Sequence, residues 1–364
     1  MIERHIASLL RDALADTPVV ALHGPRQCGK TTLAKQVAPD FPYITLDDPL
    51  SLQAATQRPS ALLAAYPEHV IIDEIQRAPE LFRAIKAEVD RNRRPGRFLL
   101  TGSANVMLLP KMSDSLAGRM EVVPLLPLSR GEILGGRESF LTRVFSEDSS
   151  LSVAPDAEWR EAIEIGGFPE PRERKSAARR EAWFSAYVKA LIDRDVRDIA
   201  EIEGLRLLPG LLSALARQVG QPLNLTSIAR ETGIPVTSVQ RYVTLLEAIY
   251  LVRLIPAWTV VKTGKVAKTA KVAFVDSGLL HHLGGGASLE NFVTMEIVKQ
   301  TTWAETRIGL RHFRSLRAYS VPIVLQRADG RVVGIHVVDR ERVEPSDFRG
   351  LEFLADVGGP QFHR

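Results

Sequence analysis

The sequence predicts an α/β protein whose N-terminal part is a parallel sheet covered by helices. An apolar run, Pro18–Leu22, leads into the glycine-containing stretch Gly24–Thr31, and a helical pattern follows. A second apolar run, Val70–Ile72, ends directly in Asp73 and Glu74. Short buried strands that alternate with helices and carry polar residues at their carboxyl ends are typical of parallel sheets.

The stretch Gly24–Thr31 fits the phosphate-loop (P-loop) pattern G-x-x-x-x-G-K-[ST]. Backbone N–H groups of such a loop form an anion nest, and the helix that follows adds its dipole. Lys30 is expected to reach the β- and γ-phosphates, and the Thr31 hydroxyl to bind Mg²⁺. The sequence therefore predicts ATP and Mg²⁺ as ligands, with a nucleotide contact set of Gly24, Pro25, Arg26, Gln27, Cys28, Gly29, Lys30, Thr31 and Thr32.

Adjacent acids at a strand end supply the second half of such a site. Asp73 is expected to hold Mg²⁺ through water, and Glu74 to polarise the attacking water as a general base. Two acids at a strand end also fit a plain surface turn. Their place downstream of a P-loop favours a nucleotide hydrolase.

Composition is that of an ordinary globular protein. The chain has 364 residues, enough for two or three domains, with 45% hydrophobic and 25% charged residues. The net charge is only +4, so affinity for nucleic acid must come from local patches. One cysteine excludes an intrachain disulfide, and no apolar run approaches 18 residues. We expect a cytoplasmic protein without a membrane segment.

Apolar periodicity gives the remaining elements of the N-terminal domain in chain order. They are a helix over Ile2–Leu14, a strand over Tyr43–Leu46, a helix near Pro59–Tyr66, a helix over Glu80–Asp90, a strand over Phe98–Leu100 and a strand over Met120–Leu126.

Polar residues follow the strand Phe98–Leu100. A side chain there would lie between the P-loop and Asp73, where it could position the attacking water. Ser103 and Asn105 are both candidates, and a helix N-cap is an equally good role for Ser103.

Arg119 directly precedes the fifth predicted strand. It is a candidate arginine finger that acts on the nucleotide of a neighbouring subunit, which would require a homo-oligomer. A plain surface arginine is the competing interpretation.

Several motifs stand in order along the chain: Gly-Pro-Arg-Gln-x-x-Gly-Lys-Thr-Thr, Leu-Asp-Asp-Pro, Ile-Ile-Asp-Glu-Ile-Gln-Arg, Leu-Leu-Thr-Gly-Ser-Ala-Asn, Ser-Leu-Ala-Gly-Arg, and later Gly-Gly-Phe-Pro-Glu and Phe-Val-Asp-Ser-Gly-Leu. With them the chain resembles the prokaryotic AAA+-type ATPases whose C-terminal region is a domain of unknown function. The resemblance implies an AAA+/ASCE-type P-loop domain over residues 1–137 and a helical lid over 138–204. It also implies that Arg194 of the lid contacts the nucleotide, although an ion-pair network with neighbouring acids is the favoured alternative.

Residues 205–283 have the pattern of a winged helix-turn-helix. Helices over Leu205–Val219 and Leu225–Glu231 precede a third that starts at Pro235, and two strands follow. In a helix-turn-helix formed by the last two of these helices, the helix that starts at Pro235 is the one that enters the major groove of DNA. The polar face of this helix supplies the candidate DNA contacts Thr237, Ser238, Gln240 and Arg241.

The hairpin between the two strands is rich in lysine. Lys262, Lys265, Lys268 and Lys271 have no acid among them and are candidate phosphate contacts of a wing. A solvated face, or a winged helix that serves as a lid or a protein docking module, is the alternative.

Residues 284–364 resemble a restriction-endonuclease-like α/β domain. Such nucleases hold Mg²⁺ with an Asp on one strand and Glu-x-Lys on the next. Here Pro322, His336 and Val338 occupy those positions, and Asp339 is one residue out of phase. We expect no nuclease activity.

Cys28 lies beside Lys30 at a helix N-terminus, and both features lower the pKa of a thiol. Its oxidation or alkylation would then block nucleotide binding. A passive small residue is the alternative.

Two classes of function follow from these patterns. In the first, Mg²⁺-dependent ATP hydrolysis is coupled to the binding or remodelling of duplex or branched DNA. In the second, the protein is a slow nucleotide switch with a protein partner. A kinase ranks third, because Glu74 beside Asp73 favours water as the phosphoryl acceptor.

Overall fold

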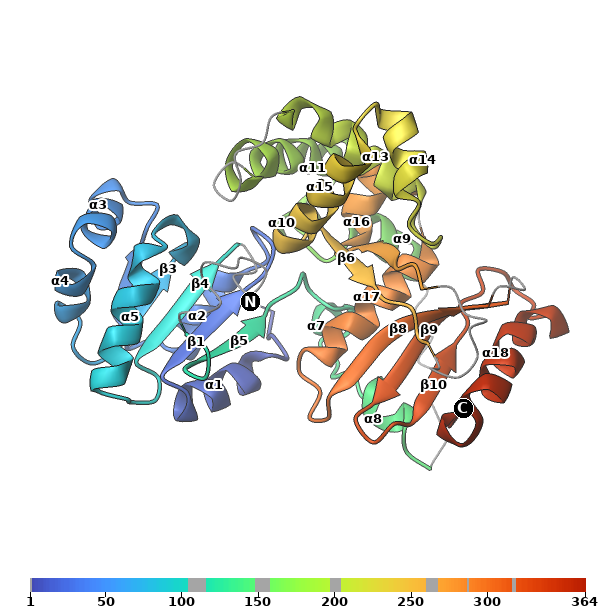
Figure 1. Cartoon of the computed structure of the whole chain (residues 1–364), viewed down its shortest axis with the longest axis horizontal. Coiled ribbons are helices and arrows are strands. Elements are labelled where there is room, and N and C mark those ends of the chain that lie inside the picture. The colour runs from blue at the N-terminus through green and yellow to red at the C-terminus, as the bar shows by residue number, and fades with distance from the viewer. Residues whose placement is uncertain are drawn as a thin grey trace.

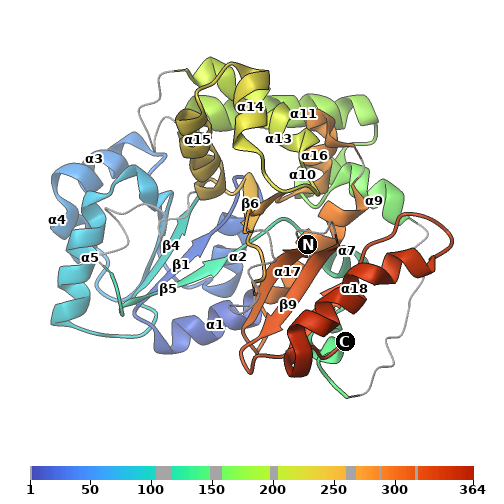
Figure 2. The ribbon, with the colours of Figure 1, turned by 45° about the vertical axis from the view of Figure 1, so that its right-hand side comes forward.

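The computed structural model describes residues 2–103, 116–147, 158–196, 204–259, 268–286, 288–315 and 319–364. These residues form a five-stranded parallel sheet with its helices, a helical region, and a three-stranded antiparallel sheet with its helices. Figures 1 and 2 show the helical region above the other two, with α17 (Leu289–Thr301) between the parallel sheet and the C-terminal sheet.

The parallel sheet confirms the predicted fold class. Its strand order is β2-β3-β4-β1-β5, so β4 separates the strand before the P-loop from the strand that carries Asp73. The strands are β1 (Val19–His23), β2 (Tyr43–Thr45), β3 (Val70–Asp73), β4 (Phe98–Gly102) and β5 (Met120–Pro124).

Both faces of this sheet are buried, as in sheets built from βαβ units. Along β1, Val20 and Leu22 belong to one core cluster, and Val19 and Ala21 to the other. The first face carries α1 (Ala7–Asp16) and α2 (Lys30–Val37), and the second carries α3 (Pro49–Gln57), α4 (Pro59–Ala64) and α5 (Glu80–Arg91), as Figure 1 shows.

The helix α3 was not expected from the sequence. The Asp48 side chain accepts a hydrogen bond from the Ser51 backbone N–H at 2.8 Å, and Pro49 occupies the first turn. An N-cap aspartate followed by proline is a strong helix start. The Leu-Asp-Asp-Pro motif is therefore a helix cap.

The helical region shares its core with the first face of the parallel sheet. Trp183, Phe184 and Tyr187 belong to the same cluster as Val20 and Leu22. Its elements are α9 (Trp159–Ile165), α10 (Pro169–Glu173), α11 (Ala177–Ala190), the π-helical turn Leu191–Asp195, the 3₁₀ turn Leu205–Leu207, α13 (Leu208–Arg217), α14 (Leu225–Thr232), α15 (Val236–Ala248), and the hairpin of β6 (Val252–Ile255) and β7 (Lys271–Phe274). The two preceding helices, α7 (Arg130–Leu134) and α8 (Phe140–Val144), lie with the C-terminal region, where α8 shares a core cluster with the C-terminal sheet.

The C-terminal sheet is antiparallel in the order β10-β9-β8. Its last strand is covered by the end of the chain, because the His363 N–H donates to the Val332 carbonyl at 2.7 Å. The elements are α16 (Ser277–Leu280), a π-helical turn His281–Gly285, α17, β8 (Ile308–Arg314), β9 (Ser320–Arg327), β10 (Val332–Ile335), α18 (Pro345–Gly358) and a 3₁₀ turn Gly359–Gln361.

Three distant segments meet where these regions join. The Leu128 N–H donates to the Gly167 carbonyl at 2.8 Å, and the Gly167 N–H donates to Asp276 Oδ2 at 2.6 Å. A Cβ on Gly167 would lie 2.3 Å from the Leu128 oxygen, so no other residue fits. Lys299 Nζ of α17 donates to the Leu128 carbonyl at 2.9 Å. The segment after β5 is thus fixed to the C-terminal region.

The described residues include neither a membrane-spanning helix nor a cluster of metal ligands. No helix among them is long and apolar enough to cross a bilayer. Within the same residues, no three His, Cys, Asp or Glu side chains are grouped where they could hold a metal ion.

Candidate functional site

The P-loop connects β1 to α2 and depends on its glycines. Gly29 has φ +100°, a left-handed conformation that favours glycine. A Cβ on Gly24 would lie 1.8 Å from the Leu125 carbonyl oxygen. Gln27 also has a positive φ, of 63°. The backbone therefore turns tightly round the start of α2, which begins at Lys30.

Lys30 folds back over the loop. Its side chain is buried, and Nζ donates to the Gly24 carbonyl at 3.0 Å and to the Pro25 carbonyl at 2.9 Å. A buried ammonium needs such acceptors. A phosphate would offer charged oxygens in exchange for these two carbonyls.

Asp73 connects the two predicted halves of the site. Its Oδ2 accepts hydrogen bonds from the Thr31 hydroxyl at 2.9 Å and from the Tyr43 hydroxyl at 2.7 Å, and Oδ1 accepts from the Thr101 hydroxyl. Burial, and then the bond to Asp73, raises the pKa of Tyr43, so the phenol stays a donor. Carboxylate and hydroxyl oxygens suit Mg²⁺, which also takes ligands from water and phosphates. Asp73 and Thr31 fit that ion.

Glu74 lies just beyond β3 in a left-handed conformation, with φ 58°. Its Oε2 accepts a hydrogen bond at 2.5 Å from Gln76 Nε2, which also donates to Ser103 Oγ at 3.1 Å. Gln76 and Ser103 are buried. Of the two residues predicted at the tip of β4, Ser103 is thus linked to Glu74, and Asn105 lies outside the described residues.

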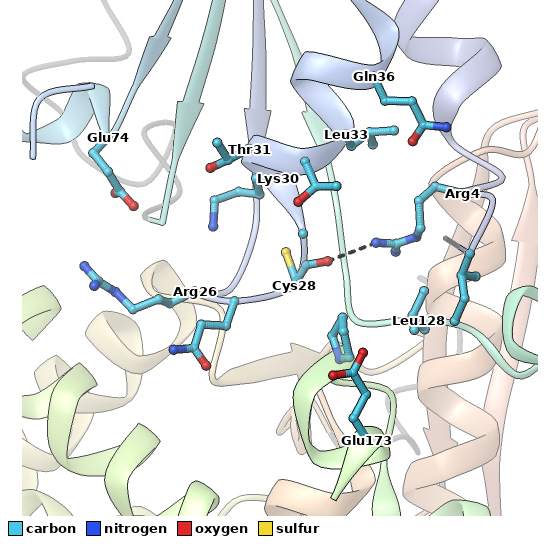
Figure 3. A pocket seen from close by; sticks show the side chains of 15 residues that line it. Arg4, Arg26, Cys28, Lys30, Thr31, Leu33, Gln36, Glu74, Leu128 and Glu173 are labelled. Carbon is cyan, nitrogen blue, oxygen red and sulfur yellow. Dashed lines mark hydrogen bonds between the residues drawn. The ribbon is translucent and has the colours of Figure 1, made fainter. Parts of the chain in front are cut away.

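A cavity of about 700 Å³ lies beside the P-loop; Lys30, Thr31 and Glu74 line it, whereas Asp73, Gln76 and Ser103 do not. Figure 3 shows Lys30, Thr31 and Glu74 on one side of it, and Arg4, Leu128 and Glu173 on others. Its lining therefore comes from the N-terminal segment, the P-loop, the segment after β5, and α10. Predicted residues that line it are Arg26, Gln27, Cys28, Gly29, Lys30, Thr31, Thr32 and Glu74.

For Cys28, the structure favours the passive role over the reactive one. The thiol is fully buried and lies 3.3 Å from the Leu125 carbonyl oxygen. Burial raises its pKa, which outweighs the lowering by Lys30 and Arg4. A buried thiol with a raised pKa is inert, so Cys28 is a packing residue.

Neither predicted arginine lies in the cavity. Arg119 stands at the amino end of β5, whereas the P-loop lies at the carboxyl ends of the strands, and it pairs with Asp90 at 2.5 Å. It can therefore serve only the nucleotide of another subunit. Arg194 is exposed and does not line the cavity, which corrects the expected lid contact. Pro169 and Glu173 are the lining residues from that region.

The predicted DNA-contacting residues divide into three groups. Thr237, Gln240 and Arg241 are exposed on α15, Ser238 is half-buried, and Lys268 is exposed. Lys271 is a correction: it is buried on β7 and pairs with Glu290 at 3.0 Å. Lys262 and Lys265 lie outside the described residues.

Sequence reasoning missed four side chains of the site. Thr101 was detectable as a polar residue at the end of an apolar strand, and Gln76 stands two residues from Glu74. Tyr43 and Arg4 gave no signal, because neither belongs to a motif. Only the fold brings them to the P-loop.

Two stretches of the chain match known domain families. Residues 16–134 match an AAA domain, and residues 156–290 match a domain of unknown function, DUF8612.

Relatives with similar sequences come from mycobacteria. Two uncharacterized proteins, of Mycobacterium tuberculosis and Mycobacterium bovis, are each 31% identical over 308 residues, which cover 81% of this chain but only 65% of theirs.

Among solved structures, a Walker-type ATPase of Pyrococcus abyssi is 16% identical, with a TM-score of 0.48 over 78% of this chain and 96% of that one. DnaA of Aquifex aeolicus bound to AMPPCP is 15% identical, with a TM-score of 0.32 over 65% of this chain and 86% of that one.

Proposed function

We propose, on the premise that residues 16–134 form an AAA-type domain with a P-loop, that this protein hydrolyses ATP to ADP and phosphate with Mg²⁺. The observation that carries the proposal is the 2.9 Å hydrogen bond between Thr31 Oγ1 and Asp73 Oδ2. It brings the two oxygen groups that suit Mg²⁺ together at the start of α2, beside Lys30.

Each residue has a distinct part in this proposal. The P-loop N–H groups and Lys30 bind the phosphates, and Thr31 and Asp73 hold the ion, which neutralises charge on the phosphates when bound. Glu74 accepts a proton from the attacking water. Gln76 and Ser103 orient the Glu74 carboxylate by the hydrogen bonds described above.

In the same proposal, hydrolysis is coupled to DNA bound by a winged helix over residues 205–283. The exposed polar side chains Thr237, Gln240 and Arg241 on α15 support this role. The junction of Leu128, Gly167 and Asp276 supports the coupling, because it connects the segment after β5 to both later regions.

A nucleotide switch that binds a protein is the second candidate. Lys271 favours it, because its ion pair with Glu290 removes one cation from the expected DNA surface.

Steady-state ATP hydrolysis tests the proposal, measured with Mg²⁺ or with EDTA, and with single-stranded, duplex or branched DNA. Turnover that needs Mg²⁺ and rises with one DNA form supports the DNA-coupled ATPase. Turnover that is indifferent to every DNA favours the switch. No Mg²⁺-dependent turnover in any condition rejects the hydrolase.

A further inference from the structure

Arg4 is buried at the edge of the P-loop, although it belongs to none of the motifs. It lies before α1, is 8% exposed and lines the cavity. Three of its N–H groups have acceptors: Nε bonds Glu132 Oε1 at 3.1 Å, Nη1 the Cys28 carbonyl at 3.0 Å, and Nη2 the Leu126 carbonyl at 2.6 Å. The planar guanidinium thus joins the P-loop to the segment after β5.

The position of the guanidinium is itself fixed. Glu132 is 4% exposed, and its carboxylate also accepts from the His5 N–H at 2.8 Å and from the Ser129 N–H at 2.9 Å. These bonds hold the carboxylate in the capping box of α7. The Arg4 guanidinium is therefore anchored by Glu132 on the side away from the P-loop.

The bond to Cys28 has a consequence for the next residue. In a trans peptide the C=O and the following N–H point in opposite directions. Figure 3 shows the Cys28 carbonyl directed to Arg4, with the Lys30 amine on the other side of the loop. Holding that oxygen turns the Gly29 N–H toward the Lys30 side, where the phosphates are expected.

We propose that Arg4 is a positioning residue for phosphate binding: by holding the Cys28 carbonyl, it orients the Gly29 N–H toward the β-phosphate of the nucleotide. This inference rests on the proposed nucleotide site. Arg4 itself touches no phosphate, and its effect depends on how many phosphates the ligand carries.

The test compares the affinities of Mg-ADP and AMP for the wild type, Arg4→Lys and Arg4→Met, by calorimetric titration. Loss of one oriented, charge-assisted N–H bond should lower the ADP-to-AMP affinity ratio by at least about tenfold in both variants. Lysine can pair with Glu132 but does not reproduce the planar fork of the guanidinium. Arg4→Lys should therefore keep the thermal unfolding midpoint of the wild type and still show the lowered ADP-to-AMP affinity ratio. Arg4→Lys alone decides the test if Arg4→Met, which removes the cation beside the buried Glu132 carboxylate, fails to fold.

Arg11→Met, at an exposed position of α1, is the matched control and should leave the ratio unchanged. Equal weakening of ADP and AMP would mean that Arg4 is only structural, and an unchanged ratio in folded Arg4→Lys would also overturn the inference. If the wild type binds no ADP, the proposed function fails, and this inference fails with it.

Discussion

At the scale of single residues, the site is held by side chains that share acceptors. Asp73 accepts from the hydroxyls of Thr31, Tyr43 and Thr101, and Glu74 accepts from Gln76. Such networks fix a carboxylate more firmly than one partner would, because each donor restricts its rotation. The two acids are thus held in different surroundings, in keeping with the different parts proposed for them.

The first prediction concerns Glu74. Glu74→Gln keeps the shape of the side chain and removes the base, so turnover should fall roughly 10²–10⁴-fold while ATP affinity stays within a few-fold. Hydrolysis assays and nucleotide titration measure both. Glu80→Gln, at an exposed position in the first turn of α5, is the control. Full activity in Glu74→Gln would remove Glu74 from the mechanism.

The second prediction concerns pH and His312. This side chain is fully buried, its Nε2 contacts the Thr269 carbonyl at 2.9 Å, and burial lowers its pKa to about 4. In the unfolded chain this side chain takes up a proton below about pH 6.5, whereas in the folded chain it stays neutral until the pH approaches 4. The free energy of unfolding is therefore highest above pH 6.5 and decreases as the pH falls toward 4.

Lowering the pH from 7 to 5 should therefore reduce the free energy of unfolding by on the order of 2 kcal/mol through His312. Urea unfolding of the wild type and of His312→Gln at both pH values measures it. The variant should lose less stability than the wild type over this interval. An identical loss in both would assign the pH dependence to other groups.

At the scale of elements, two glycines allow the segments of the junction to approach closely. Gly167 allows the Leu128 carbonyl to approach, and Gly166, with φ +77°, leaves space for Asp276, whose pKa is raised by burial. The Gly-Gly-Phe-Pro-Glu and Phe-Val-Asp-Ser-Gly-Leu motifs are therefore two sides of one contact.

The third prediction tests that contact. Gly167→Ala would place a Cβ 2.3 Å from the Leu128 oxygen and should lower the free energy of unfolding by about 2–5 kcal/mol. Gly210→Ala, on α13 with open space around it, should instead raise stability by about 0.5–1 kcal/mol. Denaturant unfolding compares the two. Equal stability of the two variants would contradict the tight approach at Gly167.

At the scale of the whole molecule, the proposed DNA contacts and the nucleotide site lie on different regions. The fourth prediction follows from the exposed face of α15. Arg241→Ala should weaken duplex DNA binding and lower the slope of log affinity against log salt by about one. Fluorescence anisotropy at several salt concentrations measures the slope. Arg349→Ala, on α18, should leave it unchanged. No change in Arg241→Ala would favour the protein-binding switch.

The fifth prediction concerns assembly. Arg119 lies at the sheet edge opposite its own P-loop, so a role in turnover requires a neighbouring subunit. Arg119→Ala should then bind ATP and turn over about 10³-fold more slowly. Mixing it with Glu74→Gln should restore activity, because each variant supplies the group that the other lacks. No recovery in mixed oligomers, or full turnover by a monomer, would leave Arg119 with only its ion pair to Asp90.

The sequence by itself determined the parallel sheet, the P-loop and the strand that ends in Asp73 and Glu74. These features depend on short-range patterns: apolar runs, a loop of fixed spacing, and polar residues at strand ends. The same locality explains why most helices and strands were found close to their observed bounds. The helix α3 was missed because its signal is a cap and a proline instead of a periodic face.

The tertiary structure alone decided which side chains surround the P-loop. Arg4 reaches the Cys28 carbonyl and Lys271 reaches Glu290 only through folding, and burial reverses the pKa shift expected for Cys28. Burial and long-range partners depend on how separate elements pack, and no local pattern encodes them. For that reason the sequence identified the chemistry of the site, and the fold determined its supporting residues.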